Sequence, residues 1–249
     1  MSEIVLETRN LKRRFGAFLA TNDVSLKVER GARHALIGPN GAGKTTLINL
    51  LTGVLPPSEG QVFLEGEDIT SLASFKRVKR GLTRTFQINQ LFNEFTPLET
   101  VALAIAEREG VGHNLFKSIS SYSKITDEAA SLLAQFGLAS VMGERTTILP
   151  YGKQRLLEIA LAFASKPRVL LLDEPAAGVP EDERHEVLQI VSDLPSDVTV
   201  LLIEHDMDLV FSFANRISVL VAGAVFTEGT VAEISSDPRV KAVYLGENA

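Results

Sequence analysis

The sequence predicts an α/β fold with a mostly parallel core sheet, an antiparallel β edge subdomain and an inserted α-helical subdomain. The core sheet is indicated by short aliphatic runs that alternate with helical segments and have no polar face. Such runs are typical of strands that are covered on both sides. They are Ala32–Ile37, Val169–Leu172, Val198–Ile203 and Ile217–Val221.

Two other regions have different patterns. The first thirty residues and Gln61–Glu65 alternate apolar and polar side chains between polar turns, which favours an antiparallel sheet. Between Pro97 and Leu149 the strand pattern is absent, and Thr126–Gly137 has apolar residues at helical spacing before a glycine. We expect one domain over 1–249, with a core at 1–96 and 150–236 that includes the antiparallel sheet, a helical insert at 97–149 and a C-terminal tail at 237–249.

The composition excludes several classes of protein. The 249 residues carry 25 Lys and Arg against 31 Asp and Glu, a net charge of −6, which argues against nucleic acid as a partner. The absence of cysteine excludes disulfides and thiolate sites and fits a reducing, cytoplasmic location. Because no stretch approaches the ~20 apolar residues of a spanning helix, and Ile217–Phe226 resembles paired strands, we expect membrane contact only through a partner.

A glycine-rich stretch lies between the strand that ends at Ile37 and the helical run Leu47–Leu51. Its residues are Gly38, Pro39, Asn40, Gly41, Ala42, Gly43, Lys44, Thr45 and Thr46. Glycines let successive N–H groups face a phosphate, lysine adds a positive charge, and a threonine hydroxyl ligates Mg²⁺. The stretch predicts a P-loop NTPase that binds nucleotide, with Lys44 at the β- and γ-phosphates and Thr45 at the metal ion.

Two carboxylates follow the buried strand Val169–Leu172. Asp173 is expected to bind Mg²⁺ through water, and the adjacent Glu174 to orient or deprotonate the attacking water. A polar turn after a strand would have the same composition. The phosphate-binding loop elsewhere in the chain favours the catalytic interpretation.

The stretch Leu149–Arg155 resembles the signature motif of ABC-type ATPases. With Gln87 after a short strand and His205 after Val198–Ile203, it completes the set of motifs of that family in order, over essentially the whole chain. The resemblance implies that Gln87 contacts Mg²⁺ and the attacking water, that His205 holds the γ-phosphate, and that Phe15 stacks on adenine. His205 as a helix cap and Phe15 as an ordinary edge-strand aromatic are the alternatives.

The resemblance also implies a second ABC ATPase subunit, because in the family the signature motif closes the phosphate loop of another chain. Gly152 and Lys153 would then face the partner's γ-phosphate at a helix N-terminus. Three positions depart from the family pattern. Pro150 replaces a serine and has no hydroxyl, Lys153 stands where Gln or Glu is common, and the loop Ala176–Pro180 lacks an aspartate.

Several strings resemble the LivG-type ATPase of branched-chain amino-acid importers. They are Arg84–Gln87, Tyr151–Arg155, Leu157–Ala160, Glu174–Gly178, Ile203–Met207, Asp237–Val240 and Ala242–Glu247. This implies a peripheral subunit on the inner face of the cell membrane that is bound to transmembrane permease subunits, energises uptake of a small polar solute, and depends indirectly on a solute-binding protein. The alternatives are the ATPase of a lipid or lipopolysaccharide export complex, and a nucleotide-gated binding scaffold with weak hydrolysis.

Two surface features have both a structural and a functional interpretation. The family would place a groove for a permease helix near Arg84, Gln87, Leu91, Phe92 and Phe95, although these residues would equally serve to pack the insert. The basic run at 76–80 is typical of a solvated helix face, and contact with anionic lipid or the permease is the alternative. The histidines at 34, 113 and 185 are expected to be structural or exposed.

Overall fold

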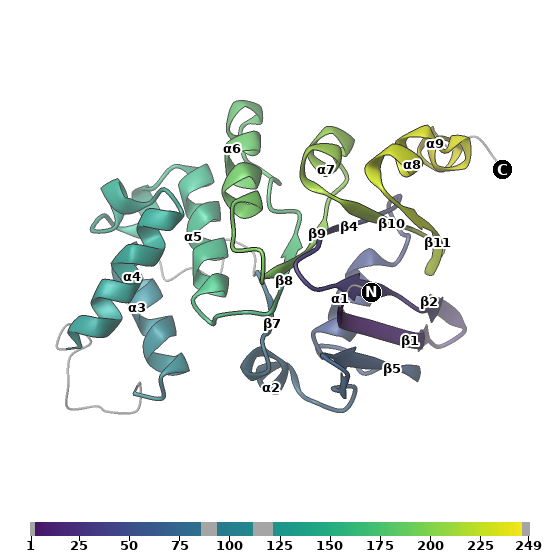
Figure 1. The fold of residues 1–249 in the computed structure, drawn as a ribbon, viewed down its shortest axis with the longest axis horizontal. Helices are drawn as coiled ribbons and strands as arrows, with labels where there is room; N and C mark the ends of the chain where they lie inside the picture. Colours follow the sequence, from purple (N-terminus) through teal and green to yellow (C-terminus); the bar gives the residue numbers. More distant parts are fainter. Residues whose placement is uncertain (1–2, 86–93, 112–121, 246–249) are drawn as a thin grey trace. The chain divides into compact units, whose positions relative to one another are not determined.

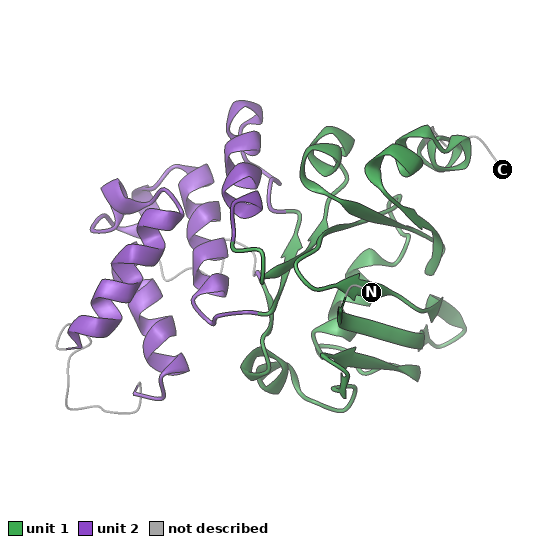
Figure 2. Cartoon of the chain, viewed as in Figure 1, with its two compact units in different colours: residues 1–84, 168–174, 195–249 green, residues 85–167, 175–194 purple. Residues whose placement is uncertain are grey.

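The computed structural model describes residues 3–85, 94–111 and 122–245. It divides into two compact units, unit 1 with residues 1–84, 168–174 and 195–249, and unit 2 with residues 85–167 and 175–194 (Figure 2). Unit 2 takes in more of the chain than the range 97–149, because it also includes the helices that follow residue 150 and residue 180. The chain passes from unit 1 to unit 2 between Glu174 and Pro175.

The larger sheet of unit 1 confirms the predicted mostly parallel core. Its strand order is β11-β10-β4-β9-β8-β7, in which the pairs from β10 to β7 are parallel and β11 is antiparallel to β10 (Figure 1). The strands are β4 (Arg33–Ile37), β7 (Leu82–Arg84), β8 (Val169–Asp173), β9 (Thr199–Ile203), β10 (Arg216–Val221) and β11 (Ala224–Gly229).

The smaller sheet of unit 1 confirms the predicted antiparallel edge. Its order is β2-β1-β5-β6, and β3 also pairs with β1. All of these pairs are antiparallel. The strands are β1 (Ile4–Phe15), β2 (Phe18–Val24), β3 (Lys27–Glu29), β5 (Glu59–Leu64) and β6 (Glu67–Asp68).

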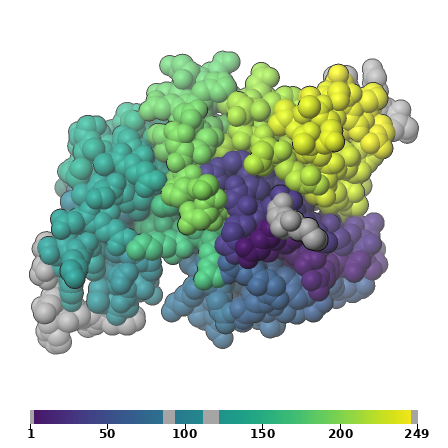
Figure 3. Space-filling view, in the orientation of Figure 1, coloured from purple at the N-terminus to yellow at the C-terminus, as the bar shows by residue number. Residues whose placement is uncertain are grey.

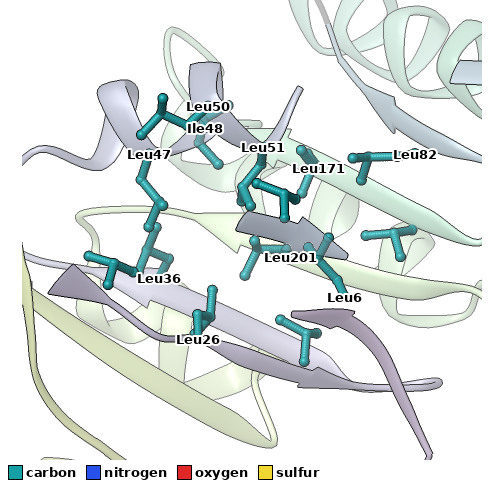
Figure 4. Packing of buried hydrophobic residues seen from close by; sticks show 14 of the residues in the cluster. Leu6, Leu26, Leu36, Leu47, Ile48, Leu50, Leu51, Leu82, Leu171 and Leu201 are labelled. Atoms are coloured by element: carbon teal, nitrogen blue, oxygen red, sulfur yellow. The ribbon is translucent and has the colours of Figure 1, made fainter. Parts of the chain in front are cut away.

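One hydrophobic cluster joins helix α1 (Lys44–Leu51) to both sheets. Leu47 and Leu51 of the helix are fully buried in it with Leu36 of β4 and Leu6 of β1 (Figure 4). Burial of leucine side chains at this scale contributes about 1.5–3 kcal/mol each. The packing therefore fixes the helix that follows the glycine-rich loop.

A second cluster covers the opposite face of the larger sheet. It contains Ala35 and Ile37 of β4, which alternate with Leu36 because successive side chains of a strand point to opposite faces. Helices α7 (Met207–Phe213), α8 (Val231–Ser236) and α9 (Pro238–Leu245) supply the covering residues, among them Val210 and Ile234. The C-terminal part of the chain, which includes α8 and α9 and is coloured yellow, forms part of the surface seen in Figure 3. Two covered faces explain the continuous aliphatic runs.

Unit 2 is helical, as predicted for the region after Pro97. Its helices are α3 (Pro97–Arg108), α4 (Ser123–Gln135), α5 (Tyr151–Phe163) and α6 (Glu181–Ser192), with short 3-10 turns at Ala139–Val141 and Thr146–Ile148. A capping box between Thr96 and Glu99 starts α3. Arg108 donates to the carbonyl of Ala164 (2.7 Å) and to Glu128 (2.8 Å), which ties α3 to α4 and to the end of α5.

The basic run at 76–80 lies on α2 (Ser74–Lys79) and continues into Arg80. Most of it is exposed, but Arg77 is buried and donates to the carbonyls of Leu50 and Leu51 (2.8 and 2.6 Å). These carbonyls belong to the last turn of α1 and have no partners within the helix. The prediction of a solvated face is therefore wrong for Arg77, which caps α1.

The longest apolar run, Ile217–Phe226, lies in the antiparallel pair of β10 and β11, as the sequence predicted. Ile217 pairs with Gly229, and Val221 with Ala224. Among the residues that the structure describes, none of the helices has the length and apolar content needed to cross a bilayer.

Candidate nucleotide site

The predicted site residues of unit 1 follow the carboxyl ends of neighbouring parallel strands. The glycine-rich loop follows β4, His205 follows β9, and Glu174 follows β8, and these strands are adjacent in the order β4-β9-β8. Carboxyl ends of parallel strands lie at one edge of a sheet, which is where open α/β sheets bind ligands. Segments more than a hundred residues apart in the sequence thereby lie at neighbouring strand ends.

Two glycines shape the loop between β4 and α1. Gly38 has a φ of 155°, and a side chain there would collide with the carbonyl oxygen of Leu220. Gly43, at the start of α1, has a φ of 97°, and its Cβ would lie 2.5 Å from the carbonyl oxygen of Ala20. The loop can approach its neighbours only without side chains at these positions. The first N–H groups of α1 are the donors that such a loop offers to a phosphate.

Lys44 folds its ammonium group back over the loop. Its Nζ donates to the carbonyls of Gly38 (2.6 Å) and Pro39 (3.1 Å). Burial lowers the pKa of Lys44, while Glu174 and Asp173 act in the opposite direction. Lys44 is thus within electrostatic reach of both carboxylates. Among the other loop residues, Asn40, Gly41 and Thr45 are exposed, Ala42 is buried and Thr46 is half-buried.

Asp173, the last residue of β8, is paired with an arginine. Its Oδ2 accepts from Nη2 of Arg84 at 2.5 Å, and Nη1 of Arg84 donates to Oδ1 of Asn49 at 2.8 Å. The sequence analysis placed Arg84 in a groove for a permease helix and missed its contact with Asp173. The contact depends on the parallel pairing of Arg84 with Leu171, which no local pattern shows.

Glu174 and His205 face each other at the same edge. The Nδ1 atom of His205 lies 3.7 Å from Glu174 Oε1 and 3.6 Å from Glu204 Oε2. The side chains of His205 and Glu174 are 63% and 46% exposed, so both can meet a ligand. The alternative in which His205 caps the next helix is wrong, because Asp206 accepts from the N–H groups at the start of α7.

Glu174 has a left-handed backbone conformation. Its φ is 48°, a region that residues other than glycine rarely occupy. Its N–H donates to the carbonyl of Ile203 on β9 at 2.9 Å. The strand pairing therefore continues through Glu174, and the chain turns directly after it.

The signature-like segment starts helix α5 of unit 2. Pro150 is the residue before the first turn, and its side chain makes no capping hydrogen bond. Gly152 is buried, and a Cβ there would collide with the carboxylate of Glu183. Lys153 lies 3.4 Å from both the carbonyl of Gly137 and Glu186 Oε1. The helix N-terminus thus carries a carboxylate beside its glycine.

Two predicted residues, Phe15 and Phe95, are exposed, and others lie outside the residues that the structure describes. Phe15 ends β1, is 45% exposed and lies 4.8 Å, ring centroid to guanidinium carbon, from Arg13. Phe95 is also exposed. Gln87 lies outside the described residues, as do the groove residues Leu91 and Phe92 and the histidine at 113.

Three polar side chains of unit 1, His34, Ser218 and Glu228, form a hydrogen-bonded series. From the sequence, His34 was expected only to be structural or exposed. His34 is fully buried, with its Nε2 2.7 Å from Ser218 Oγ, and Ser218 in turn donates to Glu228. Because the Ser218 proton goes to Glu228, His34 donates from Nε2 and its Nδ1 is left buried without a hydrogen-bond partner. Burial, assisted by Arg216, lowers the pKa of His34 to about 4.

Comparison with known proteins identifies the family. Residues 21–177 match the family model described as ABC transporter, and residues 224–249 match the one described as branched-chain amino acid ATP-binding cassette transporter. The first of these matches spans more than half of the chain. The chain belongs to the ABC transporter family.

Similar ABC transporter proteins match this chain from end to end. It is 42% identical to the high-affinity branched-chain amino acid transport ATP-binding protein BraF of Pseudomonas aeruginosa, over 99% of this chain and 100% of that one. It is 38% identical to LivG of Escherichia coli over the same shares. The ADP conformation of MJ1267, an ATP-binding cassette of an ABC transporter, superposes with a TM-score of 0.87 at 33% identity, over 98% of this chain and 99% of that chain.

As an ATPase of this family, the chain binds nucleotide, and its residues also fit Mg²⁺. Mg²⁺ is usually held by one or two protein oxygens together with substrate phosphates rather than by a protein cage. The described residues contain no cluster of three His, Cys, Asp or Glu that could hold a metal ion. Thr45, on the first turn of α1, and Asp173, at the end of β8, offer the oxygens that such a shared site needs.

Proposed function

We propose that this chain is the ATP-hydrolysing subunit of an importer of branched-chain amino acids or a related amino acid or amide. The observation that carries the proposal is the end-to-end match to branched-chain amino acid transport ATP-binding proteins, at 42% identity for BraF. The separate match of residues 224–249 to the branched-chain family model supports it, because this tail lies outside the general ABC transporter match.

In the proposed reaction, the side chains at the carboxyl edge of the sheet divide the work. Lys44 neutralises charge on the β- and γ-phosphates, and the N–H groups at the start of α1 cradle them. Glu174 orients the attacking water and accepts its proton, and His205 donates to the γ-phosphate. Bound Mg²⁺, held by Thr45 and Asp173, supplies positive charge to the same phosphates. We also propose that Gln87 contacts the metal and the water and that Phe15 stacks on adenine.

The proposed assembly contains a second ATPase subunit, identical or related, and permease subunits at the inner face of the cell membrane. Gly152 and Lys153 would face the γ-phosphate bound to the second subunit, at the N-terminus of α5. The Glu183 carboxylate lies where a side chain at position 152 would point, so a residue with a Cβ would not fit beside it.

The test is purification of the tagged full-length chain from solubilised membranes, identification of the copurifying chains, and ATPase measurements on the reconstituted complex. The proposal expects permease subunits, a related ATPase, and stimulation of hydrolysis by leucine, isoleucine or valine with a solute-binding protein. An export permease and stimulation by lipid would contradict import. Failure of the complex to hydrolyse ATP under any of these conditions would favour a nucleotide-gated scaffold.

A further inference from the structure

Arg155, in the second turn of α5, reaches the residue that follows Glu174. Its Nε donates to the carbonyl oxygen of Pro175 at 2.9 Å, and its Nη1 donates to Oε2 of Glu158 at 2.5 Å. The side chains of Arg155 and Glu158 are 6% and 3% exposed. The helix that begins at the signature-like segment therefore holds the backbone next to the proposed catalytic carboxylate.

Hydrogen bonds fix the backbone both before and after the Glu174 side chain. The left-handed conformation of Glu174 is unfavourable for a residue with a side chain. On the strand side, the N–H of Glu174 is fixed by the carbonyl of Ile203. On the other side, Pro175 has no N–H to donate, so its carbonyl is the backbone group left for an anchor. Arg155 provides that anchor.

Stability alone does not account for the pair of Arg155 and Glu158. A buried ion pair contributes no more, and often less, than well-packed apolar side chains of similar volume, because both charges lose their hydration. The pair is also incomplete, since Oε1 of Glu158 is buried without a hydrogen-bond partner. Burial raises the pKa of Glu158 to about 7, against the opposing effect of Arg155. What the pair provides is a rigid, directed guanidinium.

We propose that Arg155, fixed by Glu158, is a positioning residue that keeps the Glu174 carboxylate aimed at the attacking water by holding the Pro175 carbonyl. The inference rests on the catalytic role proposed for Glu174. Arg155 itself does not touch the nucleotide in this account. Its loss should lower kcat with little effect on the affinity for ATP, because the phosphate loop remains intact.

The experiment compares Arg155→Met with a control at Arg108, a residue of α3 that holds a backbone carbonyl at the other end of α5. Arg108 also donates to a backbone carbonyl, that of Ala164, and to carboxylates, those of Glu128 and Glu109, and it lies in the same unit. ATP hydrolysis by the purified transporter complex is measured at about pH 8, where Glu158 is mostly ionised. We expect kcat to fall about 100-fold for Arg155→Met, as for a misplaced catalytic group, with KM changed less than about threefold and Arg108→Met near normal.

Two further variants separate positioning from general destabilisation. Arg155→Lys keeps the positive charge but lacks the planar guanidinium that donates to Pro175 and Glu158 at the same time. Its kcat should therefore lie between those of Arg155→Met and the wild-type chain. Arg155→Met should add little to the loss caused by Glu174→Gln, because residues that act through one group are not additive. Multiplying effects in the double variant, or equal losses of kcat for Arg155→Met and Arg108→Met, would overturn the proposal.

The outcomes also distinguish this inference from the function on which it rests. An inactive Glu174→Gln with a fully active Arg155→Met would remove only the positioning role of Arg155. A fully active Glu174→Gln would remove the catalytic role of Glu174 and the inference together.

Discussion

Arg84 and Asp173 form an ion pair at the carboxyl edge of the sheet, with Nη2 and Oδ2 separated by 2.5 Å. Each side chain is about three-quarters buried, and Arg84 also bonds to Asn49 on α1. The guanidinium thus joins the helix after the phosphate loop to the carboxylate proposed to bind Mg²⁺. It holds one oxygen of Asp173 and so fixes the orientation of that carboxylate.

Arg84→Met should destabilise the chain because it leaves Asp173 partly buried with one charged partner fewer. We expect the free energy of unfolding in urea to fall by about 1–3 kcal/mol. Lys12→Met, which breaks the more exposed pair with Glu59, is the control and should have much less effect. The difference in free energy of unfolding between Arg84→Met and the wild-type chain should become smaller when Mg²⁺ and ATP are added, since the metal ion supplies positive charge near Asp173. A deficit that is equal with and without them would argue against Asp173 as a metal ligand.

Lys44→Ala should weaken nucleotide binding, because it removes the charge that the loop directs toward the phosphates. A hydrogen bond to a charged group is worth about 1.5–3 kcal/mol, which corresponds to a roughly 10- to 100-fold rise in Kd. Isothermal calorimetry with ATP measures this directly. Lys27→Ala, on an exposed position of β3, is the control. Unchanged affinity in Lys44→Ala would contradict the phosphate-loop assignment.

His34 predicts a loss of stability in mild acid. Its pKa is lowered from 6.5 to about 4 in the folded chain, so between these values the unfolded chain binds a proton that the folded chain does not. Unfolding is therefore favoured as the pH falls from 6.5 toward 4, by up to about 3 kcal/mol. Below about pH 4 this contribution no longer changes.

The measurement is the free energy of unfolding as a function of pH for the wild-type chain and His34→Gln. The variant should have a flatter profile between about pH 5 and 6.5, where few carboxylates titrate. His185→Gln changes an exposed histidine and should keep the wild-type slope. Identical slopes in all three chains would show that His34 binds its proton equally in both states.

Pro150→Ser should strengthen ATP-driven association, because it restores a hydroxyl at the start of α5. Pro150 makes no capping bond, and a serine there has a free hydroxyl for a phosphate across the interface. We expect the dimerisation constant with ATP to improve about tenfold or more, as measured by sedimentation in a Glu174→Gln background. Pro150→Ala removes the proline without adding a hydroxyl, and equal association of the two variants would show that the hydroxyl has no role.

The sequence predicted the core because its signal is local. Leu36 lies between Ala35 and Ile37 in a strand with two covered faces, so these three neighbours are all aliphatic, and each run of this kind proved to be a strand. Two of these strands lead to candidate site residues. The glycine-rich loop joins β4 to Lys44, and Glu174 is the first residue after β8. The carboxyl end of a parallel strand is where open α/β sheets bind ligands, which is why Glu174 was a candidate from the sequence.

The pairings that the sequence analysis missed are long-range. Arg77 stands in a basic run that looks solvated, yet it is buried because the last carbonyls of α1 need donors. Arg84 meets Asp173 through strand register, and Arg155 meets Pro175 through a helix twenty residues earlier in the chain. Charge patterns give no sign of such partners, since the same arginine would be equally consistent with a solvated surface.

The central claim is that Glu174 activates water for hydrolysis of ATP held by the loop at 38–45. The most direct measurement is single-turnover hydrolysis by Glu174→Gln in the purified complex, together with ATP affinity and the oligomeric state. The account predicts that hydrolysis falls at least about 100-fold, that ATP still binds with wild-type affinity, and that an ATP-bound dimer accumulates. Wild-type hydrolysis by this variant would contradict it.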